Sequence, residues 1–137
     1  MNVIENSAVS LKMTFIRLFL WYPIMRLTRK PNDAQRKVLL HILKTNKITS
    51  YGQDHGFETI ASVEDYRAAV PVNRYEDLRD YIRTQEADKK PQLNSQQPVM
   101  YARTSGTTSE PKYIPILKQT IVQHRRNQHI AAFAAYL

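Results

Sequence analysis

The chain has 137 residues, 42% of them apolar and 23% charged, which is the composition of a folded globular domain and excludes a disordered chain. It contains no cysteine, which excludes disulfides, thiolate zinc sites and cysteine nucleophiles and fits a cytoplasmic location. The net charge of +8 favours a polyanionic partner such as a nucleotide, a nucleic acid or an anionic membrane, without choosing among them.

Residues 9–29 have the apolar spacing of a helix, and we expect residues 1–30 to form an N-terminal helix. This helix either packs on the rest of a larger protein or makes peripheral contact with a membrane, with Trp21 near the interface. Residues 18–25 are uncharged and largely apolar, but eight residues are too few for a spanning helix, and no cleaved signal is evident. The expected apolar stripe consists of Leu11, Phe15, Leu18 and Tyr22.

The next part, residues 31–95, is predicted to be mainly helical. Residues 31–33 offer an N-cap for a helix that runs through Asn46. The pairs Tyr51-Gly52 and His55-Gly56 predict a loop.

Ser62 and Asp65 have the spacing of a capping box that opens a short helix, residues 63–69, and Pro71 ends it. Residues 75–83 form another predicted helix, in which Glu76, Asp77 and Asp80 are expected to face solvent. The polar residues 89–97, which include Pro91, are predicted to be a loop.

The character of the sequence changes in residues 96–137. Residues 98–102 and 113–116 are predicted to be strands, joined by residues 103–112, and a helix is predicted after Leu117. The fold class is therefore α/β: a mainly helical part, a two-stranded hairpin and a final helix.

The connection between the two strands is rich in hydrogen-bond donors. Four hydroxyl side chains flank one glycine, Pro111 stiffens the exit, and Lys112 adds a cation. The pattern arises by chance in about one of 10⁵ chains of this length, and it lacks the second glycine of a Walker loop. It predicts a phosphate-binding loop, with Glu110 pointing to solvent. The candidate residues are Thr104, Ser105, Gly106, Thr107, Thr108, Ser109 and Lys112.

This loop resembles the phosphate-binding motif of the luciferase-like adenylate-forming superfamily. The segment Ser62-Val-Glu-Asp-Tyr-Arg-Ala-Ala-Val-Pro-Val72, followed by Tyr75-Glu-Asp-Leu78 and Tyr81-Ile82, is similar to the N-terminal region of the Gretchen Hagen family of acyl-acid amido synthetases. The two Gly-containing pairs at 51–56 and the Tyr113-Ile-Pro115 segment are similar as well. The resemblance covers roughly residues 33–120.

The resemblance implies the N-terminal part of an enzyme that uses ATP and Mg²⁺. A carboxylic acid becomes an acyl-adenylate, and an amine or amino acid then displaces AMP. Residues 104–108 would hold the β- and γ-phosphates, with added charge from Lys112; Ser109 replaces a glycine that is common in the superfamily. The adenine, magnesium and acyl sites of the family lie downstream of this motif, so no catalytic residue can be assigned, and we expect the chain to be a fragment.

Two alternatives remain open. One is a small basic module that binds nucleic acid or an anionic surface through pairs such as Arg29-Lys30, Arg36-Lys37 and Arg125-Arg126. The other is a truncated relative that binds ATP without catalysis. His124 and His129 lack the spacing and the neighbouring carboxylate of a zinc site, so no metal site is predicted.

Overall fold

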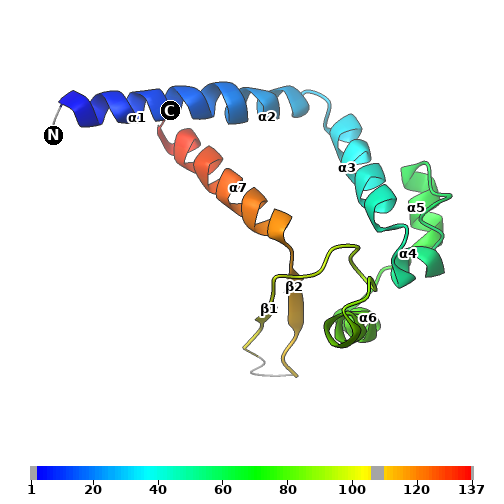
Figure 1. Ribbon diagram of the computed structural model, residues 1–137. Helices are drawn as coiled ribbons and strands as arrows, with labels where there is room; N and C mark the ends of the chain where they lie inside the picture. The colour runs from blue at the N-terminus through cyan, green and yellow to red at the C-terminus, as the bar shows by residue number, and fades with distance from the viewer. Residues whose placement is uncertain (1–2, 106–109, 137) are drawn as a thin grey trace. The chain divides into compact units, whose positions relative to one another are not determined.

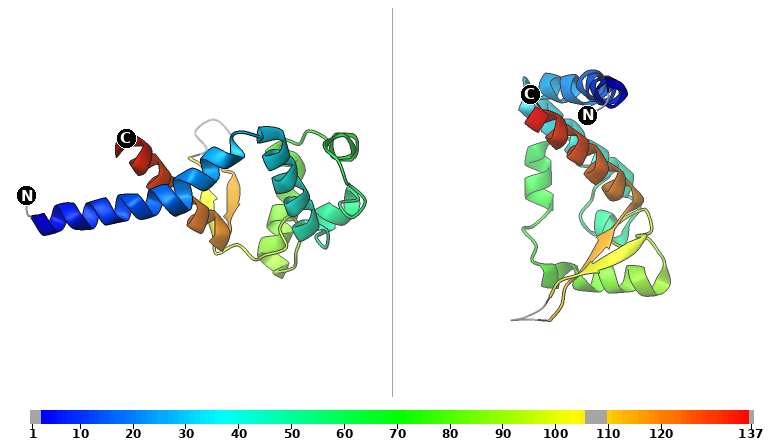
Figure 2. Two further views of the ribbon diagram at one scale, coloured as in Figure 1. Left: turned by 90° about the horizontal axis from the view of Figure 1, so that it is seen from above. Right: turned by 90° about the vertical axis from the view of Figure 1, so that its left-hand side faces the viewer.

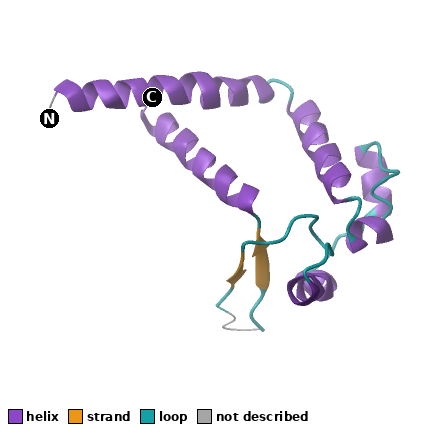
Figure 3. Ribbon diagram, in the orientation of Figure 1, coloured by secondary structure: helices purple, strands orange, loops and turns teal. Residues whose placement is uncertain are grey.

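The computed structural model describes residues 3–105 and 110–136 (Figures 1 and 3). The chain divides into two compact units, one made of residues 1–34 and 119–137 and the other of residues 35–118. The elements in chain order are α1 (Val3–Ile16), the π-helix η1 (Arg17–Trp21), α2 (Tyr22–Leu27), α3 (Pro31–Asn46), α4 (Ser50–Asp54), α5 (Val63–Ala69), α6 (Tyr75–Asp88), β1 (Met100–Arg103), β2 (Tyr113–Ile116) and α7 (Lys118–Tyr136).

This order confirms the predicted sequence of a mainly helical part, a two-stranded hairpin and a final helix. The division into residues 1–30, 31–95 and 96–137 as parts of an adenylation domain stays a prediction.

In the first unit, α1, η1 and α2 form one helical rod that packs on α7. Ile16 is 3% exposed, and the rings of Trp21 and Phe133 are 5.5 Å apart. The apolar stripe predicted from the sequence does not take part in this packing: Leu11 is 75% exposed and Phe15 57%. The helix is apolar on more than one side, and α7 covers another side than the stripe. Packing of the stripe on a larger protein and contact with a membrane both stay predictions.

The length of this rod also corrects the sequence analysis. The helix Ser7–Leu27 has 21 residues and is long and apolar enough to cross a membrane, by length and composition only. A core helix of a soluble protein and a signal sequence meet the same criterion. A core helix is mostly buried, whereas only 6% of the most apolar part of this helix is buried. The uncharged stretch of residues 18–25 is only part of this helix, because Lys12 and Arg17 do not interrupt it.

The core of the second unit lies between α3, α4 and the segment that follows α4. Its buried residues are Leu43, Tyr51, Phe57 and Ile60. Tyr51 contacts Phe57 and Tyr81 edge-on, and its hydroxyl accepts a hydrogen bond from Asn73 at 2.5 Å. Burial raises the pKa of Tyr51, which therefore stays protonated as a hydrogen-bonding phenol.

Tyr51 and Gly52 belong to α4 and not to a loop, which corrects the sequence analysis. The fully buried Thr49 caps this short helix: its hydroxyl accepts from the Gly52 amide at 2.9 Å and donates to the Asn46 carbonyl at 2.7 Å. A Cβ on Gly52 would lie 2.2 Å from that same carbonyl oxygen, so glycine here permits close packing. Gly56, with φ of +61°, ends this part as a turn residue.

Local capping determines where the next helices begin. The capping box of Ser62 and Asp65 is confirmed, with bonds of 3.0 and 2.9 Å, and α5 ends before Pro71 as predicted. The Asp77 carboxylate accepts from the Arg74 amide at 2.7 Å at the start of α6. α6 runs to Asp88, five residues past the predicted end at Arg83.

Residues 92–96 are held to α6 by one buried side chain. Gln85 is 2% exposed. Its amide donates to the carbonyls of Asn94 and Gln96, and its oxygen accepts from three backbone amides of residues 92–94. This anchor sets where the chain enters β1.

The two strands form an antiparallel pair (Figure 2). Met100 faces Ile116, and Arg103 faces Tyr113. A further bond joins the Val99 amide to the Ile116 carbonyl at 2.8 Å. The hairpin therefore brings the two ends of the predicted phosphate-binding loop together, at Thr104 and Lys112.

Candidate functional site

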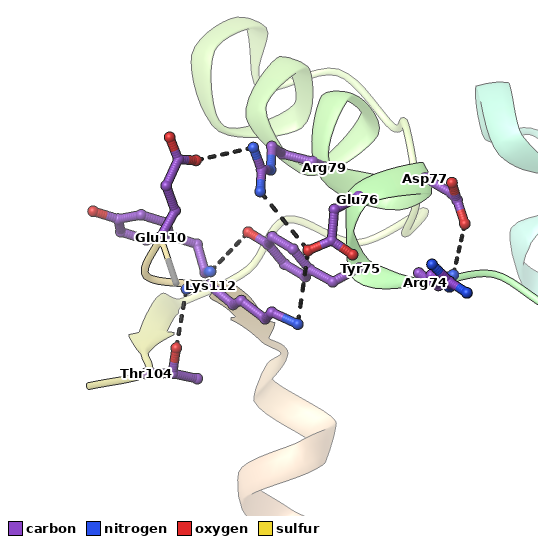
Figure 4. Close-up of polar contacts among 9 residues, drawn as sticks. Arg74, Tyr75, Glu76, Asp77, Arg79, Thr104, Glu110 and Lys112 are labelled. Carbon is purple, nitrogen blue, oxygen red and sulfur yellow. Dashed lines mark hydrogen bonds and ion pairs between the residues drawn. The ribbon is translucent and has the colours of Figure 1, made fainter. Parts of the chain in front are cut away.

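The candidate loop closes through reciprocal bonds between Thr104 and Lys112. The Thr104 amide donates to the Lys112 carbonyl at 3.1 Å, and the Lys112 amide donates to the Thr104 hydroxyl at 3.0 Å (Figure 4). Because that hydroxyl accepts one bond, its own O–H remains able to donate to an anion. Ser105 is exposed beside it, whereas Gly106, Thr107, Thr108 and Ser109 lie outside the described residues.

The first turn of α6 supports the loop. The Tyr75 hydroxyl accepts from the Tyr113 amide at 2.8 Å, and the Lys112 ammonium lies 5.4 Å from the centre of the Tyr75 ring. The same ammonium lies 3.8 Å from a carboxylate oxygen of Glu76. Lys112 is thus held beside an aromatic face and a carboxylate, at the position where the loop returns to the sheet (Figure 4).

A second cation, Arg79, faces the same group of residues. Its guanidinium donates to Glu110 at 2.9 Å, lies 3.9 Å from Glu76 and 5.7 Å from the centre of the Tyr75 ring. Glu110 is 69% exposed, as expected from the sequence, and is also paired with Arg79. Glu76 and Asp77 are exposed as expected too, and they have roles that the sequence did not predict: Glu76 lies beside both cations, and Asp77 caps α6.

The structure therefore brings Thr104, Ser105 and Lys112 to one end of the hairpin and adds three residues that the sequence analysis did not assign. These are Tyr75, Glu76 and Arg79. Tyr75 and Glu76 stand in the Tyr75-Glu-Asp-Leu78 segment that carried the family resemblance. That segment lies well before the loop in the sequence, so the sequence gave no sign that the two are in contact.

Other titratable groups nearby do not form a metal site. Within residues 3–105 and 110–136, no group of three or more His, Cys, Asp or Glu side chains could hold a metal ion. Burial, with a contribution from the Glu86 carboxylate, raises the pKa of Tyr101 in β1, so this phenol stays neutral. What the described part of the site offers an anion is the hydroxyls of Thr104 and Ser105 and two cations, each of which is paired with a carboxylate.

Comparison with known proteins identifies the family. Residues 23–136 match the GH3 family N-terminal domain. The chain is 33% identical over 100 residues to indole-3-acetic acid-amido synthetase GH3.4 of Arabidopsis thaliana, covering 72% of this chain. It is 30% identical over 108 residues, 75% of this chain, to jasmonoyl–L-amino acid synthetase GH3.5 of Oryza sativa subsp. japonica.

The matched region spans 17% of the length of the first of these relatives and 19% of the second. The family match nevertheless covers most of this chain, from α2 to the end of α7. The chain belongs to the GH3 family.

Proposed function

We propose that this chain is the N-terminal part of an acyl-acid amido synthetase that activates a carboxylic acid with ATP and joins it to an amine or amino acid. The observation that carries the proposal is the closed turn between β1 and β2, whose donors and cations lie together in a chain of the GH3 family. One relative is named an indole-3-acetic acid-amido synthetase and another a jasmonoyl–L-amino acid synthetase, and both names support the reaction class.

In this proposal, residues 104–108 and Lys112 hold the β- and γ-phosphates. The O–H of Thr104 and the exposed Ser105 donate from one end of the loop, and the Lys112 ammonium supplies charge at the other. Attack of the carboxylate oxygen on the α-phosphorus expels pyrophosphate, so donors that stabilise charge on the departing group lower the barrier.

The fit to Mg²⁺ differs from the fit to the triphosphate. The nearest carboxylates among the described residues, Glu76 and Glu110, are paired with Lys112 and Arg79 and form no three-ligand group. Magnesium would neutralise phosphate charge when bound, and either carboxylate could approach it only by leaving its present cation.

The test is acid-dependent exchange of labelled pyrophosphate into ATP by the intact protein, which isolates the first half-reaction. A lost hydrogen bond to a charged group is worth roughly 1.5–3 kcal/mol, so Thr107→Ala and Thr108→Ala should each slow exchange by about one to two decades. Gly106→Val should cost more, because a β-branched residue resists positive φ and fills the space of a phosphate. Exchange that survives Gly106→Val undiminished overturns the proposal.

Lys112→Ala supplies a second arm with a matched control. It should weaken ATP binding, and the loss should shrink at high salt because Lys112 is partly exposed and its charge is screened. Lys118→Ala removes an exposed lysine six positions away and should leave ATP binding unchanged. If ATP binds and no acid of a broad panel supports exchange, the chain belongs instead to a non-catalytic ATP-binding relative.

A further inference from the structure

The N-terminal rod presents an apolar face to solvent. We define this N-terminal apolar face by its exposed members, which are Leu11, Phe15, Leu18, Phe19, Tyr22 and Met25. The rings of Phe15 and Phe19 are 4.6 Å apart, so they form one continuous patch. Packing on α7 uses other residues of the rod, among them Ile16 and Trp21, and so leaves this face uncovered.

The charge around this face has one sign. Between Glu5 and Asp33 the chain has no acidic residue and five basic ones, namely Lys12, Arg17, Arg26, Arg29 and Lys30. The Arg17 guanidinium donates to the Tyr22 hydroxyl at 2.9 and 3.2 Å, which directs this cation along the rod. A surface with apolar centre and basic flanks is complementary to anionic phospholipid headgroups above acyl chains.

A hollow in the same surface combines both chemistries. It has a volume of about 600 Å³ and is lined by Leu18, Tyr22, Met25 and Leu27 together with Arg26 and Arg29. Guanidinium groups recognise phosphate oxygens, and the apolar lining suits hydrocarbon. A phospholipid carries both groups in this arrangement.

The family comparison sets most of this face apart from the shared domain. The GH3 match begins at residue 23, so five of the six members of this face, from Leu11 to Tyr22, precede it. A face that covers the remainder of a GH3 enzyme would be expected inside the shared region. We therefore propose that the N-terminal apolar face docks this protein on the surface of an anionic phospholipid membrane, independently of the chemistry proposed for the loop.

Docking parallel to the surface fits the structure better than spanning does. This rod packs on α7 through Trp21 and Phe133, so a spanning rod would carry α7 into the bilayer with it. α7 carries Arg125 and Arg126 in its middle and cannot enter hydrocarbon at low cost. The exposed face alone is free to insert among the headgroups.

The test is flotation of the intact protein with vesicles of three parts phosphatidylcholine to one part phosphatidylserine, compared with phosphatidylcholine alone. Binding should require phosphatidylserine. Phe15→Ser with Phe19→Ser should lower the partition coefficient about a hundredfold, because burial of each ring is worth about a factor of ten. Arg26→Gln with Arg29→Gln should lower it about 25-fold at low salt, at about fivefold for each charge, and less at 0.5 M salt.

The matched control is Ile48→Ser with Val122→Ser, two exposed apolar residues of similar exposure, 60% and 59%, on other elements. These substitutions should leave binding unchanged, and a thermal melt of every variant shows that it is folded. Leu11→Ser is a milder variant, expected to lower binding severalfold if the double phenylalanine variant does not fold.

Three outcomes overturn the proposal. In the first, the protein does not bind anionic vesicles and the Phe15→Ser/Phe19→Ser variant melts at a lower temperature than the parent. This result would show that the rest of the chain covers the face. Another is self-association that this variant abolishes without any vesicle binding, which would indicate a second copy. The third is retention in membranes after alkaline carbonate extraction, which would indicate a spanning helix.

Discussion

Replacing Gln85 with methionine tests whether one buried amide fixes the approach to the hairpin. Methionine is unbranched and of similar size, so the change removes hydrogen bonds with little change in volume. Of the five bonds that Gln85 makes, three are 3.0 Å or shorter. At about 1 kcal/mol for each of these three, unfolding should become easier by about 3 kcal/mol.

The assay is urea unfolding followed by far-UV circular dichroism, with the midpoint compared at unchanged slope. The control is Gln123→Met, the same chemical change on the exposed surface of α7, which should alter stability by less than about 0.5 kcal/mol. A cost below about 1 kcal/mol for Gln85→Met would refute the reasoning, because it would mean that water satisfies residues 92–96 equally well.

Gln85→Glu separates hydrogen bonding from packing at the same position. The carboxylate keeps an acceptor for the backbone amides but places a second oxygen against the carbonyls of Asn94 and Gln96. Protonation restores a donor, so the pKa of the new carboxyl should be raised in the folded state. Its destabilisation relative to the parent should then shrink as the pH falls, and a deficit independent of pH would show that shape alone matters.

Three further perturbations have directions set by the structure. The hydrogen bond to the Asp54 carboxylate raises the pKa of Tyr81 to about 12 from a usual value near 10. The stability that this bond contributes is therefore complete below pH 10 and is lost between pH 10 and 12. Tyr81→Phe should lower stability at neutral pH and flatten the alkaline decline, as measured by urea unfolding. Gly52→Ala places a Cβ 2.2 Å from a backbone carbonyl and should cost about 2 kcal/mol or more in the same assay. Glu76→Gln releases Lys112 from a partly exposed ion pair and should tighten ATP binding to the intact protein by up to about fivefold in calorimetric titration.

What the sequence predicted well is local. The capping box at Ser62 and Asp65 joins residues three positions apart, so its signature is visible in one short stretch. The end of α5 before Pro71 follows from the geometry of proline itself. The hairpin likewise joins strands that are adjacent along the chain, and the loop between them marked its position.

What the sequence did not predict depends on distant partners. The short helix α4 has glycine inside it, and a five-residue segment has little helical tendency on its own. It is stabilised by the Thr49 cap and by Tyr51, whose ring packs against Phe57 and Tyr81. Gln85 is a similar case, because a glutamine on a polar helix shows no sign in the sequence that its amide is buried.

The candidate site shows how such distant contacts change a functional interpretation. Read alone, residues 104–112 consist of donors and a cation, with Glu110 as an exception. In the structure Arg79, 31 residues before Glu110, pairs with that carboxylate, and Glu76 lies between Arg79 and Lys112. Two cations and two carboxylates cancel in net charge, so the positive field of the isolated motif is largely neutralised.

It follows that phosphate affinity at this loop would be a difference between two interactions rather than a sum of donors. A triphosphate gains Lys112 and Arg79 only to the extent that it replaces the carboxylates that already hold them. These ion pairs are partly exposed, so each is worth about 1 kcal/mol or less and can be exchanged at small cost. In the proposed site Glu76 and Glu110 would hold the cations in place before a nucleotide binds, and they would set how strongly the loop distinguishes a triphosphate from an anion of lower charge.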